Sequence, residues 1–450
     1  MPEAAGNDLD LLADLVKRAR AAGADAADAM LVRSAASSHS RRLGAVEHVE
    51  RQESRDLGLR VLVGKQQAAN SSTDLSGEAL AALIDRTVAM ARAVPPDPWC
   101  GLADPSEIAR VWGDLDLEDP AEPAPEALAE AAAACEAAAL GVKGVSNSEG
   151  AEAGWGRAQM AVVASNGFSG TWARTSHSVS VSVIAGEGTA MERDYDWTSA
   201  VHRVDLEDAA TVGRRAGERT VALLGARRLP SRQMPVVFEP RVASGLLRHL
   251  VGAISGTSVA RRASFLMDSL GKRVFAPGIV VRDDPLRRRG PRSQPFDGDG
   301  IAGAPRNIVE DGVLTSWLLD LPTARQLGLA TTGHASRGTG GPGGPSPSNL
   351  WLAAGTATPE ELMADIEDGF YVTSMMGMGV SMVTGDYSRG AGGFRIEKGR
   401  ITHPVSEVTV AGNLRDMFAR LVPANDLVFR WGLDTPTVRV DGMTVAGGGA

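Results

Sequence analysis

Apolar residues recur with two different periods along this chain of 450 residues. A spacing of three to four residues predicts amphipathic helices, whereas strict alternation predicts strands with one buried face. The helical spacing predicts helices at residues 9–19, 77–93, 125–140 and 206–224. The alternation predicts strands at residues 29–32, 44–50, 57–63, 160–164, 168–174 and 178–183.

Local residues mark the ends of several of these elements. Ser76 is a suitable N-cap for the second helix, Pro125 suits the first turn of the third, and Gly141 ends it. The Asn166-Gly167 pair between two alternating segments predicts a tight hairpin. Helices and antiparallel strands occur without a regular βαβ rhythm. The pattern therefore predicts an α+β fold with antiparallel sheets and helices.

Two changes of composition suggest the domain organisation. A stretch rich in Pro and Asp, residues 95–125, is a plausible connector, and beyond Pro230 the chain changes to short strands, glycines and loops. We therefore predict an N-terminal α+β domain at 1–94, a middle segment at 95–229 that completes the N-terminal half, and a β-rich C-terminal domain at 230–450. The Gly- and Pro-rich stretch 338–348 is predicted to be a mobile loop.

Charge and cysteine usage narrow the class of protein. A net charge of −9 argues against a nucleic-acid partner, and the run Arg287–Arg289 with Arg292 is flanked by aspartates, which indicates a solvated loop. Cys100 and Cys135 form no CxxC pair, as expected of a reduced cytoplasmic protein. The N-terminus lacks signal-peptide features, and no apolar run reaches the ~20 residues of a membrane span. We therefore expect a cytoplasmic protein with no membrane partner.

The stretch 245–256 has the character of a metalloprotease helix without metal ligands. A helical zinc site needs two imidazoles with an acidic residue beside them as general base. Where a His-Glu-x-x-x-His pattern would fall, this chain has Arg248, His249 and Ala253. Arg stays protonated and Ala has no donor, so we expect neither a metal site nor catalytic residues here. Gly252 is interpreted as a packing glycine.

A second candidate site is rich in glycine. Its residues could border a groove in which an extended peptide pairs with backbone groups, or they could form turns and bulges that need positive φ. His334 is predicted to be a hydrogen-bonded structural histidine. The candidate groove or interface residues are Gly377, Gly379, Asp386, Tyr387, Ser388 and Arg389.

Several motifs, in order along nearly the whole chain, resemble the TldD/PmbA family, and within it the PmbA (TldE) branch. They are residues 70–76, 191–195, 252–256, 264–272, 295–297, 384–391 and 404–414. The resemblance implies a two-domain α+β fold and a dimer, typically with a TldD-type chain, in a cytosolic peptidase that acts on unfolded or modified peptides. It also implies that the TldD-type chain holds zinc through two histidines and a late cysteine. The matching positions here are Arg248, Ala253 and the region Phe429–Gly432, and His249 takes the place of the glutamate.

The first hypothesis is a non-catalytic subunit without its own cofactor, whose TldD-type partner supplies zinc. The alternative is a stand-alone homodimer that binds peptides or regulates another enzyme, and a third hypothesis is different chemistry at Arg248, His249 and Asp386. In the first, residues 246–255 are helical, with Leu247, Val251 and Ile254 facing the core. Arg248 and His249 then face a cleft or the dimer interface. Arg248 is expected to pair with a carboxylate from Asp386, Glu407 or the partner.

Overall fold

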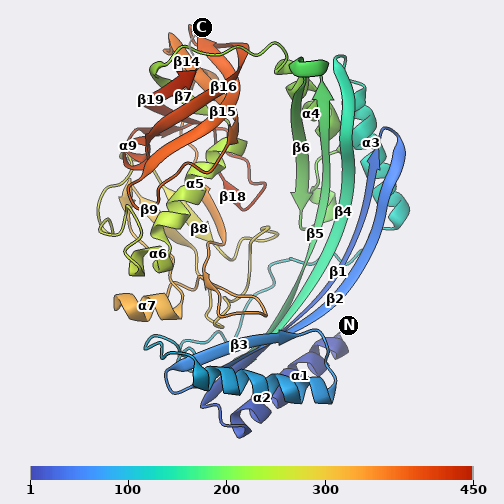
Figure 1. Cartoon of the computed structure of the whole chain (residues 1–450), viewed down its shortest axis with the longest axis vertical. Coiled ribbons are helices and arrows are strands. Elements are labelled where there is room, and N and C mark those ends of the chain that lie inside the picture. Colours follow the sequence, from blue (N-terminus) through green and yellow to red (C-terminus); the bar gives the residue numbers. More distant parts are fainter. Residues whose placement is uncertain (1, 448–450) are drawn as a thin grey trace.

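The structure, a computed structural model, describes residues 2–447. One wall of the molecule is a six-stranded antiparallel sheet, the long sheet, with strand order β3-β2-β1-β4-β5-β6 (Figure 1). It takes strands from both of the predicted segments 1–94 and 95–229. The strands are β1 Ala26–Arg42, β2 Ala45–Val63, β3 Gln66–Ser72, β4 Val145–Ala164, β5 Ser169–Ala185 and β6 Glu192–Ala200.

These strands are much longer than the apolar alternation predicts. The alternation places a strand at residues 29–32, whereas β1 has 17 residues and β4 has 20. The apolar pattern covers only the end of β1 that lies under helices, and the remainder carries serines and arginines while the strand pairing with β2 and β4 continues. Side-chain burial, and not the backbone ladder, produces the alternation, so the pattern stops where the helical cover stops.

Two pairs of helices cover opposite ends of the outer face of the long sheet. They are α1 Pro2–Ala21 with α2 Gly77–Ala93, and α3 Pro125–Leu140 with α4 Ala209–Ala222. Ser76 caps α2 as predicted. The sequence also suggests Asn7 or Asp8 as the cap of the first helix, but both lie inside α1, and Asp8 accepts hydrogen bonds from Arg33 at 2.5 and 2.7 Å. The helix predicted at 206–224 begins only at Ala209, because Asp208 caps it. Within residues 2–447 no helix is both long and apolar enough to cross a membrane.

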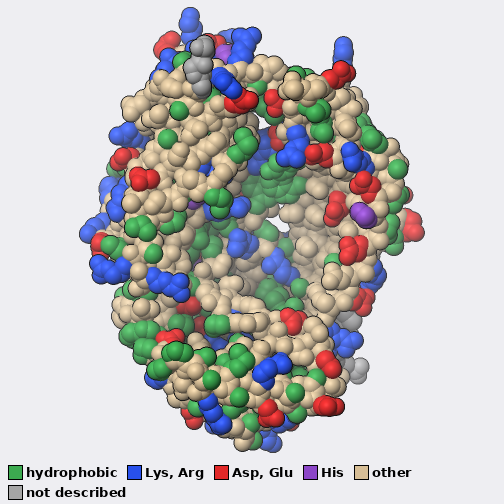
Figure 2. All heavy atoms as spheres, viewed as in Figure 1, with side chains coloured by type: hydrophobic (Ala, Val, Ile, Leu, Met, Phe, Trp, Pro, Cys, Tyr) green, Lys and Arg blue, Asp and Glu red, His purple; other side chains and the backbone are tan. Residues whose placement is uncertain are grey.

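The inner face of the long sheet carries serines along β5. Strand β6 adds the rings of Tyr195 and Trp197 to the same face, and Met30 and Val162 pack inward from β1 and β4. Val179, Val181 and Val183 pack under α3 and α4, so alternation turns Ser178, Ser180 and Ser182 to the opposite face. On β4, a Cβ added to Gly154 would lie 3.2 Å from the Ser178 hydroxyl. This inner face looks across a hollow towards the C-terminal half of the chain (Figure 2).

The C-terminal half contains a barrel and a smaller sheet. The strands β16-β15-β14-β7-β19 form one sheet that the pairing of β16 with β19 closes, and β17 extends it at β19. The barrel strands are β7 Arg232–Phe238, β14 Asp368–Met376, β15 Asp386–Glu397, β16 Arg400–Asn413, β17 Leu421–Pro423 and β19 Val438–Gly447. The second sheet contains β10 Val313–Leu314, β9 Arg306–Glu310, β8 Val281–Asp284, β13 Asn349–Leu352 and β18 Leu433–Asp434. The α+β class with antiparallel sheets is confirmed.

The remaining α-helices are α5, which has 15 residues, and four short ones of five to seven residues. The helices are α5 Pro240–Ile254, α6 Gly256–Ala260, α7 Leu321–Leu327, α8 Pro359–Met363 and α9 Leu414–Ala419. The stretch predicted as a mobile loop carries β12 Gly344–Pro345, which pairs with β11 Ala335–Ser336. Within this stretch Thr339 packs on Gly58 of β2, and its hydroxyl donates to Asp56.

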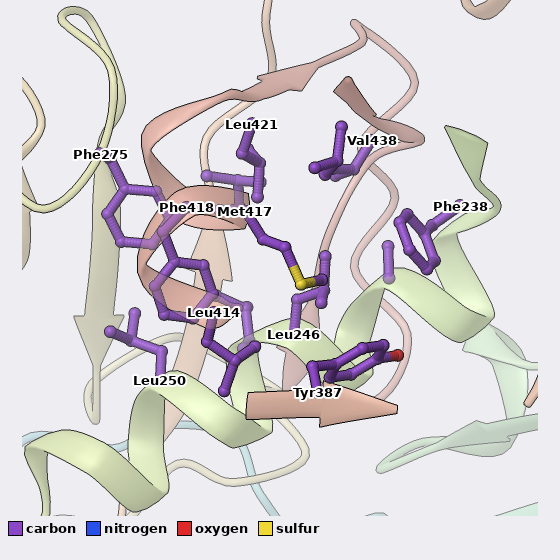
Figure 3. Close-up of a cluster of buried hydrophobic side chains, with 14 of the residues drawn as sticks. Phe238, Leu246, Leu250, Phe275, Tyr387, Leu414, Met417, Phe418, Leu421 and Val438 are labelled. Carbon is purple, nitrogen blue, oxygen red and sulfur yellow. The ribbon is translucent and has the colours of Figure 1, made fainter. Parts of the chain in front are cut away.

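A large apolar cluster between the barrel, the smaller sheet and α5 forms the core of the C-terminal half (Figure 3). Leu246 and Leu250 reach into it from α5, and Tyr387 reaches it from β15. Phe275 and Phe418 stack inside it, with ring centroids 4.7 Å apart. Helix α5 is therefore held by the core along one side, and its other side is free to form part of a site.

Two clusters of charged side chains join the two halves of the chain. In the lower junction, Arg60 pairs with Asp28 at 2.5 Å and with Asp299 at 3.4 Å, while Arg337 pairs with Asp28 at 2.5 Å. All four side chains are at most 6% exposed. Burial alone would raise the pKa of Asp28, but the charges of Arg337 and Arg60 lower it. The charges of Asp28 and Asp299 likewise outweigh burial and raise the pKa of Arg60.

The upper junction consists of Asp194, Arg219, Glu239 and Arg241. Arg241 donates two parallel hydrogen bonds to Asp194, at 2.9 and 3.0 Å, and a third to Glu239 at 2.9 Å. Arg219 pairs with Glu239, and the Arg241 guanidinium lies 4.8 Å from the centre of the Tyr195 ring. This cluster fastens the start of α5 to β6. The hollow that Figure 2 shows lies between the long sheet and the C-terminal half.

We expect Arg60→Met to destabilise the protein by about 3–5 kcal/mol, because it leaves the buried Asp299 without its cation and Asp28 with Arg337 alone. Urea unfolding followed by circular dichroism measures this. The control is Arg18→Gln, which removes an exposed pair with Asp14 and should change stability by about 0.5 kcal/mol or less. Equal effects of the two substitutions would show that the lower junction does not stabilise the fold.

Candidate functional site

Helix α5 carries the residues that the sequence singled out. It begins at Pro240, which suits a first helical turn, and ends at Ile254, one residue before the predicted end. Leu247 and Ile254 are buried as predicted, and Val251 packs against the core while partly buried. The fully buried side also includes Ala253, the position of the second metal-binding histidine in the resemblance.

The opposite side of α5 faces away from the core. With 3.6 residues per turn, it brings together Arg241, Gly245, Arg248, His249 and Gly252. Arg241 is held in the upper junction, which fixes the N-terminal end of this side. Arg248 is exposed, and His249 is half-buried.

Strand β15 and the loop before it lie against this side of α5. The Tyr387 ring meets His249 edge-on, with ring centroids 5.8 Å apart. A Cβ on Gly245 would lie 4.0 Å from Arg389 Nη1, and a Cβ on Gly252 would lie 3.1 Å from Met382 Cε. The structure thus brings the two sequence-predicted sites together. It also supports the interpretation of Gly252 as a packing glycine inside a regular helix.

His249 lies in an environment that disfavours positive charge. Burial, with the charges of Arg389 and Arg248, lowers the pKa of His249 to about 4. Its Nε2 is buried and has no hydrogen-bond partner in residues 2–447. Burial also raises the pKa of Tyr387 to about 12, so this ring stays neutral. The site presents one neutral imidazole between two guanidinium groups.

The Gly-rich stretch forms a tight turn next to this imidazole. Gly377 has φ +78° directly after β14, and a Cβ on Gly379 would lie 2.1 Å from the Ser388 carbonyl oxygen. Ser388 donates its N–H to Gly379, at 2.7 Å. These two glycines therefore meet a backbone need, as one of the two sequence interpretations proposed. Whether the stretch contacts a peptide stays a prediction.

The carboxylates expected to pair with Arg248 are bound elsewhere in this chain. Asp386 accepts hydrogen bonds from Thr384 at 2.6 Å and from Asn413 at 3.2 Å, and Glu407 pairs with Arg228. The prediction that Asp386 or Glu407 pairs with Arg248 is thus wrong. Because Asp386 is exposed and adjacent to the buried Tyr387 on a strand, its side chain points to the opposite face from the one that meets His249. The structure does not unite Arg248, His249 and Asp386 as a catalytic group.

The residues present do not fit the zinc ion that the resemblance implies for a TldD-type chain. Arg248 and the fully buried methyl group of Ala253 offer no donor, and the surrounding arginines repel a cation. In the region of the expected cysteine, Trp431 stacks on Trp197, and Asp434 accepts backbone N–H groups from residues 430–432. Within residues 2–447 no three His, Cys, Asp or Glu side chains gather so that they could hold a metal ion.

Comparisons with known proteins agree with this architecture. Domain models of the PmbA/TldA metallopeptidases match residues 27–91 (domain 1), 118–224 (central domain) and 231–447 (C-terminal domain). The chain is 40% identical to the Metalloprotease PmbA of Escherichia coli O157:H7 over 94% of its own length and 92% of that protein. The chain belongs to the PmbA/TldD family.

Solved structures of family members share the fold. A putative modulator of DNA gyrase from Bacteroides thetaiotaomicron superposes with a TM-score of 0.90 at 28% identity, covering 97% of this chain and 98% of that one. TldE from Thermococcus kodakarensis superposes with a TM-score of 0.85 at 18% identity, covering 97% and 100%. Family motifs also lie at the junctions, since Asp194 belongs to the segment 191–195.

The burial and pairing of several charged residues around this site cannot be recognised from the sequence. The run Arg287–Arg289 with Arg292 is not simply a solvated loop. Arg289 pairs with Asp116 and Asp205, Arg287 lies over the Phe429 ring, and Arg292 is half-buried. No local signal distinguishes Arg292 from its neighbours. His334 does match its prediction, because it is buried and hydrogen-bonded to Asp283 and Thr332.

We expect His249→Leu to stabilise the protein by about 1 kcal/mol near neutral pH, because Leu removes a buried polar atom without a partner. The gain should grow as the pH falls from 6.5 towards 4. In that window the unfolded chain binds a proton at residue 249 and the folded chain does not, so wild-type stability falls with pH. Urea unfolding at several pH values tests this. Parallel stability curves for the two proteins would contradict the assignment of His249.

Proposed function

We propose that this chain is a TldE/PmbA-type subunit of a cytosolic zinc metallopeptidase complex, in which a TldD-type partner carries the zinc. Family membership supports the metallopeptidase context. The proposal assigns this chain no catalytic residue of its own. Its role is to complete the cleft that takes up unfolded or modified peptides.

One observation carries the proposal. At the helix position where a zinc-bearing relative needs an anionic or neutral donor set, this chain places His249 between Arg248 and Arg389. Burial lowers the pKa of His249 to about 4 together with the charges of Arg389 and Arg248, and these two charges also oppose a divalent cation. The buried position of Ala253 adds to this, because an imidazole there would have to displace packed core side chains.

In this proposal, the hollow is the part of the subunit that takes up the peptide substrate. Its walls are α5 with β15 on one side and the inner face of the long sheet on the other. The inner face presents Ser178, Ser180 and Ser182, which are small and polar. An unfolded peptide that lies against this wall would meet the serine hydroxyls and, on the same face, the rings of Tyr195 and Trp197.

The proposal predicts that the isolated, untagged chain carries no stoichiometric zinc after dialysis. Atomic absorption measures the metal content, and a TldD-type chain purified in the same way is the positive control. One full equivalent of zinc bound to this chain would overturn the proposal.

We further expect that the isolated chain does not hydrolyse an unstructured peptide, and that a mixture with its cognate TldD-type chain does. Because the zinc would reside in the partner, a chelator should abolish hydrolysis by the mixture. Mass spectrometry of the peptide products measures this. Failure of the two chains to associate at micromolar concentration would favour the alternative, a stand-alone homodimeric binding or regulatory protein.

A further inference from the structure

Four arginines from four separate elements meet beside the hollow without a carboxylate partner. They are Arg174 on β5, Arg248 on α5, Arg292 in the loop after β8, and Arg389 on β15. No ion pair joins any of them to an acidic side chain in the part of the chain that the structure describes. By contrast, the arginines of the upper and lower junctions each pair with at least one carboxylate.

Arg174 and Arg292 come from the two opposite walls. Arg174 shares the inner face of β5 with Ser178, and its guanidinium donates to the carbonyl of Pro291. Arg292 follows directly, and its stem lies over Gly432, where a Cβ would be 2.5 Å from Arg292 Cγ. Burial and the charge of Arg292 lower the pKa of Arg174, so the two groups lie close enough to repel each other.

Arg248 and Arg389 continue this cluster along α5. Arg389 donates from Nε to the carbonyl of Gly377, at 3.0 Å, which places its Nη1 near Gly245. Arg248 acts electrostatically on two neighbours, since its charge helps to lower the pKa values of both His249 and Arg292. The side chains thus form two pairs, Arg174 with Arg292 and Arg248 with Arg389, and the charge of Arg248 also acts on Arg292.

The acidic side chains nearest to this region have other partners. Asp283, which partly offsets the charge of Arg292, is fully buried and accepts hydrogen bonds from His334 and Ser348. Asp434 accepts three backbone N–H groups, and Glu207 pairs with Arg215 and Arg430. Asp386 is held by Thr384 and Asn413. Within residues 2–447 none of these acids forms an ion pair with the four arginines, and only Asp283 offsets the charge of one of them, Arg292.

Three of these arginines are half-buried and Arg248 is exposed. Half-buried like charges cost stability unless an anion neutralises them, and guanidinium groups bind carboxylates in a planar, two-bonded geometry. We propose that Arg174, Arg248, Arg292 and Arg389 form a carboxylate-binding site of this subunit, which selects peptides bearing acidic side chains or a free C-terminal carboxylate. The proposal rests on the proposed function in that it takes a peptide as the ligand. It adds a preference for negative charge.

Fluorescence anisotropy with the full-length chain at low salt tests this site. The probes are a labelled unstructured peptide rich in Glu, the same peptide with every Glu replaced by Gln, and both forms with a free or an amidated C-terminus. We expect the double variants Arg174→Gln/Arg292→Gln and Arg248→Gln/Arg389→Gln each to weaken binding of the acidic peptide roughly tenfold or more. Arg400→Gln is the matched control, because Arg400 is an exposed, unpaired arginine at the β15–β16 turn.

The peptide arms separate the two sources of carboxylate. A loss of affinity with the Gln peptide assigns the site to acidic side chains, and a loss on amidation assigns it to the chain terminus. Equal affinity for all four peptides overturns the proposal, and this comparison needs no variant to fold. Unchanged affinity in both double variants, with unchanged thermal midpoints, overturns it as well.

Association with the TldD-type chain is measured in parallel, so that the two proposals fail separately. Variants that assemble normally but lose the acidic peptide support the carboxylate site and leave the proposed function intact. Variants that lose assembly while binding peptide normally would show that the arginines serve the partner interface, which overturns the carboxylate site alone. If the wild-type chains never associate, the proposed function fails, whatever the peptide affinities.

Discussion

The paired hydrogen bonds from Arg241 to Asp194 determine where α5 lies in this molecule. Arg241 sits in the first turn of α5 and also binds Glu239, so one guanidinium connects the helix start, the preceding residue and strand β6. The lower junction joins β1 and β2 to the C-terminal half through Arg60 and Arg337, without contacting α5. Because the two junctions fix the long sheet to the C-terminal half at two places, the length of the strands between them sets the space between the long sheet and α5. The site depends on ion pairs that touch no ligand.

The identity of a few side chains on α5 then decides what the shared scaffold can do. A zinc site on such a helix needs neutral imidazoles and an anionic neighbour. The anionic side chain makes the empty site negative, which favours the cation. Here the same side of the helix carries guanidinium groups, and the second ligand position has become part of the core. The fold is retained, but the exposed side of α5 is positively charged, whereas a cation site there would have to be neutral or negative.

Sequence reasoning succeeded where the determinants are local. Ser76 caps α2, Pro125 opens α3, and the 3.6-residue period identifies the buried side of α5. It failed for the long strands, whose central parts lack helical cover and so lack alternation. It could not find the junctions, because Asp28 and Arg337 are 309 positions apart and either residue alone resembles a surface charge. The burial of Arg292 likewise depends on Gly432, a glycine with φ +76° whose missing side chain makes room for the arginine stem.

The strict alternation of β5 assigns two roles to two sets of side chains: one set packs the sheet on its helices, and the other faces the hollow. Val179, Val181 and Val183 hold the long sheet to its helices, while Ser178, Ser180 and Ser182 touch no apolar core. These three serines can therefore change in size, charge or hydrogen-bonding capacity with little effect on the packing of the sheet on α3 and α4. Gene duplication could diversify this wall for new cargoes while the outer face stays constant. For the same reason, substitutions at these three serines would alter the wall of the hollow and leave the packing of the long sheet on α3 and α4 unchanged.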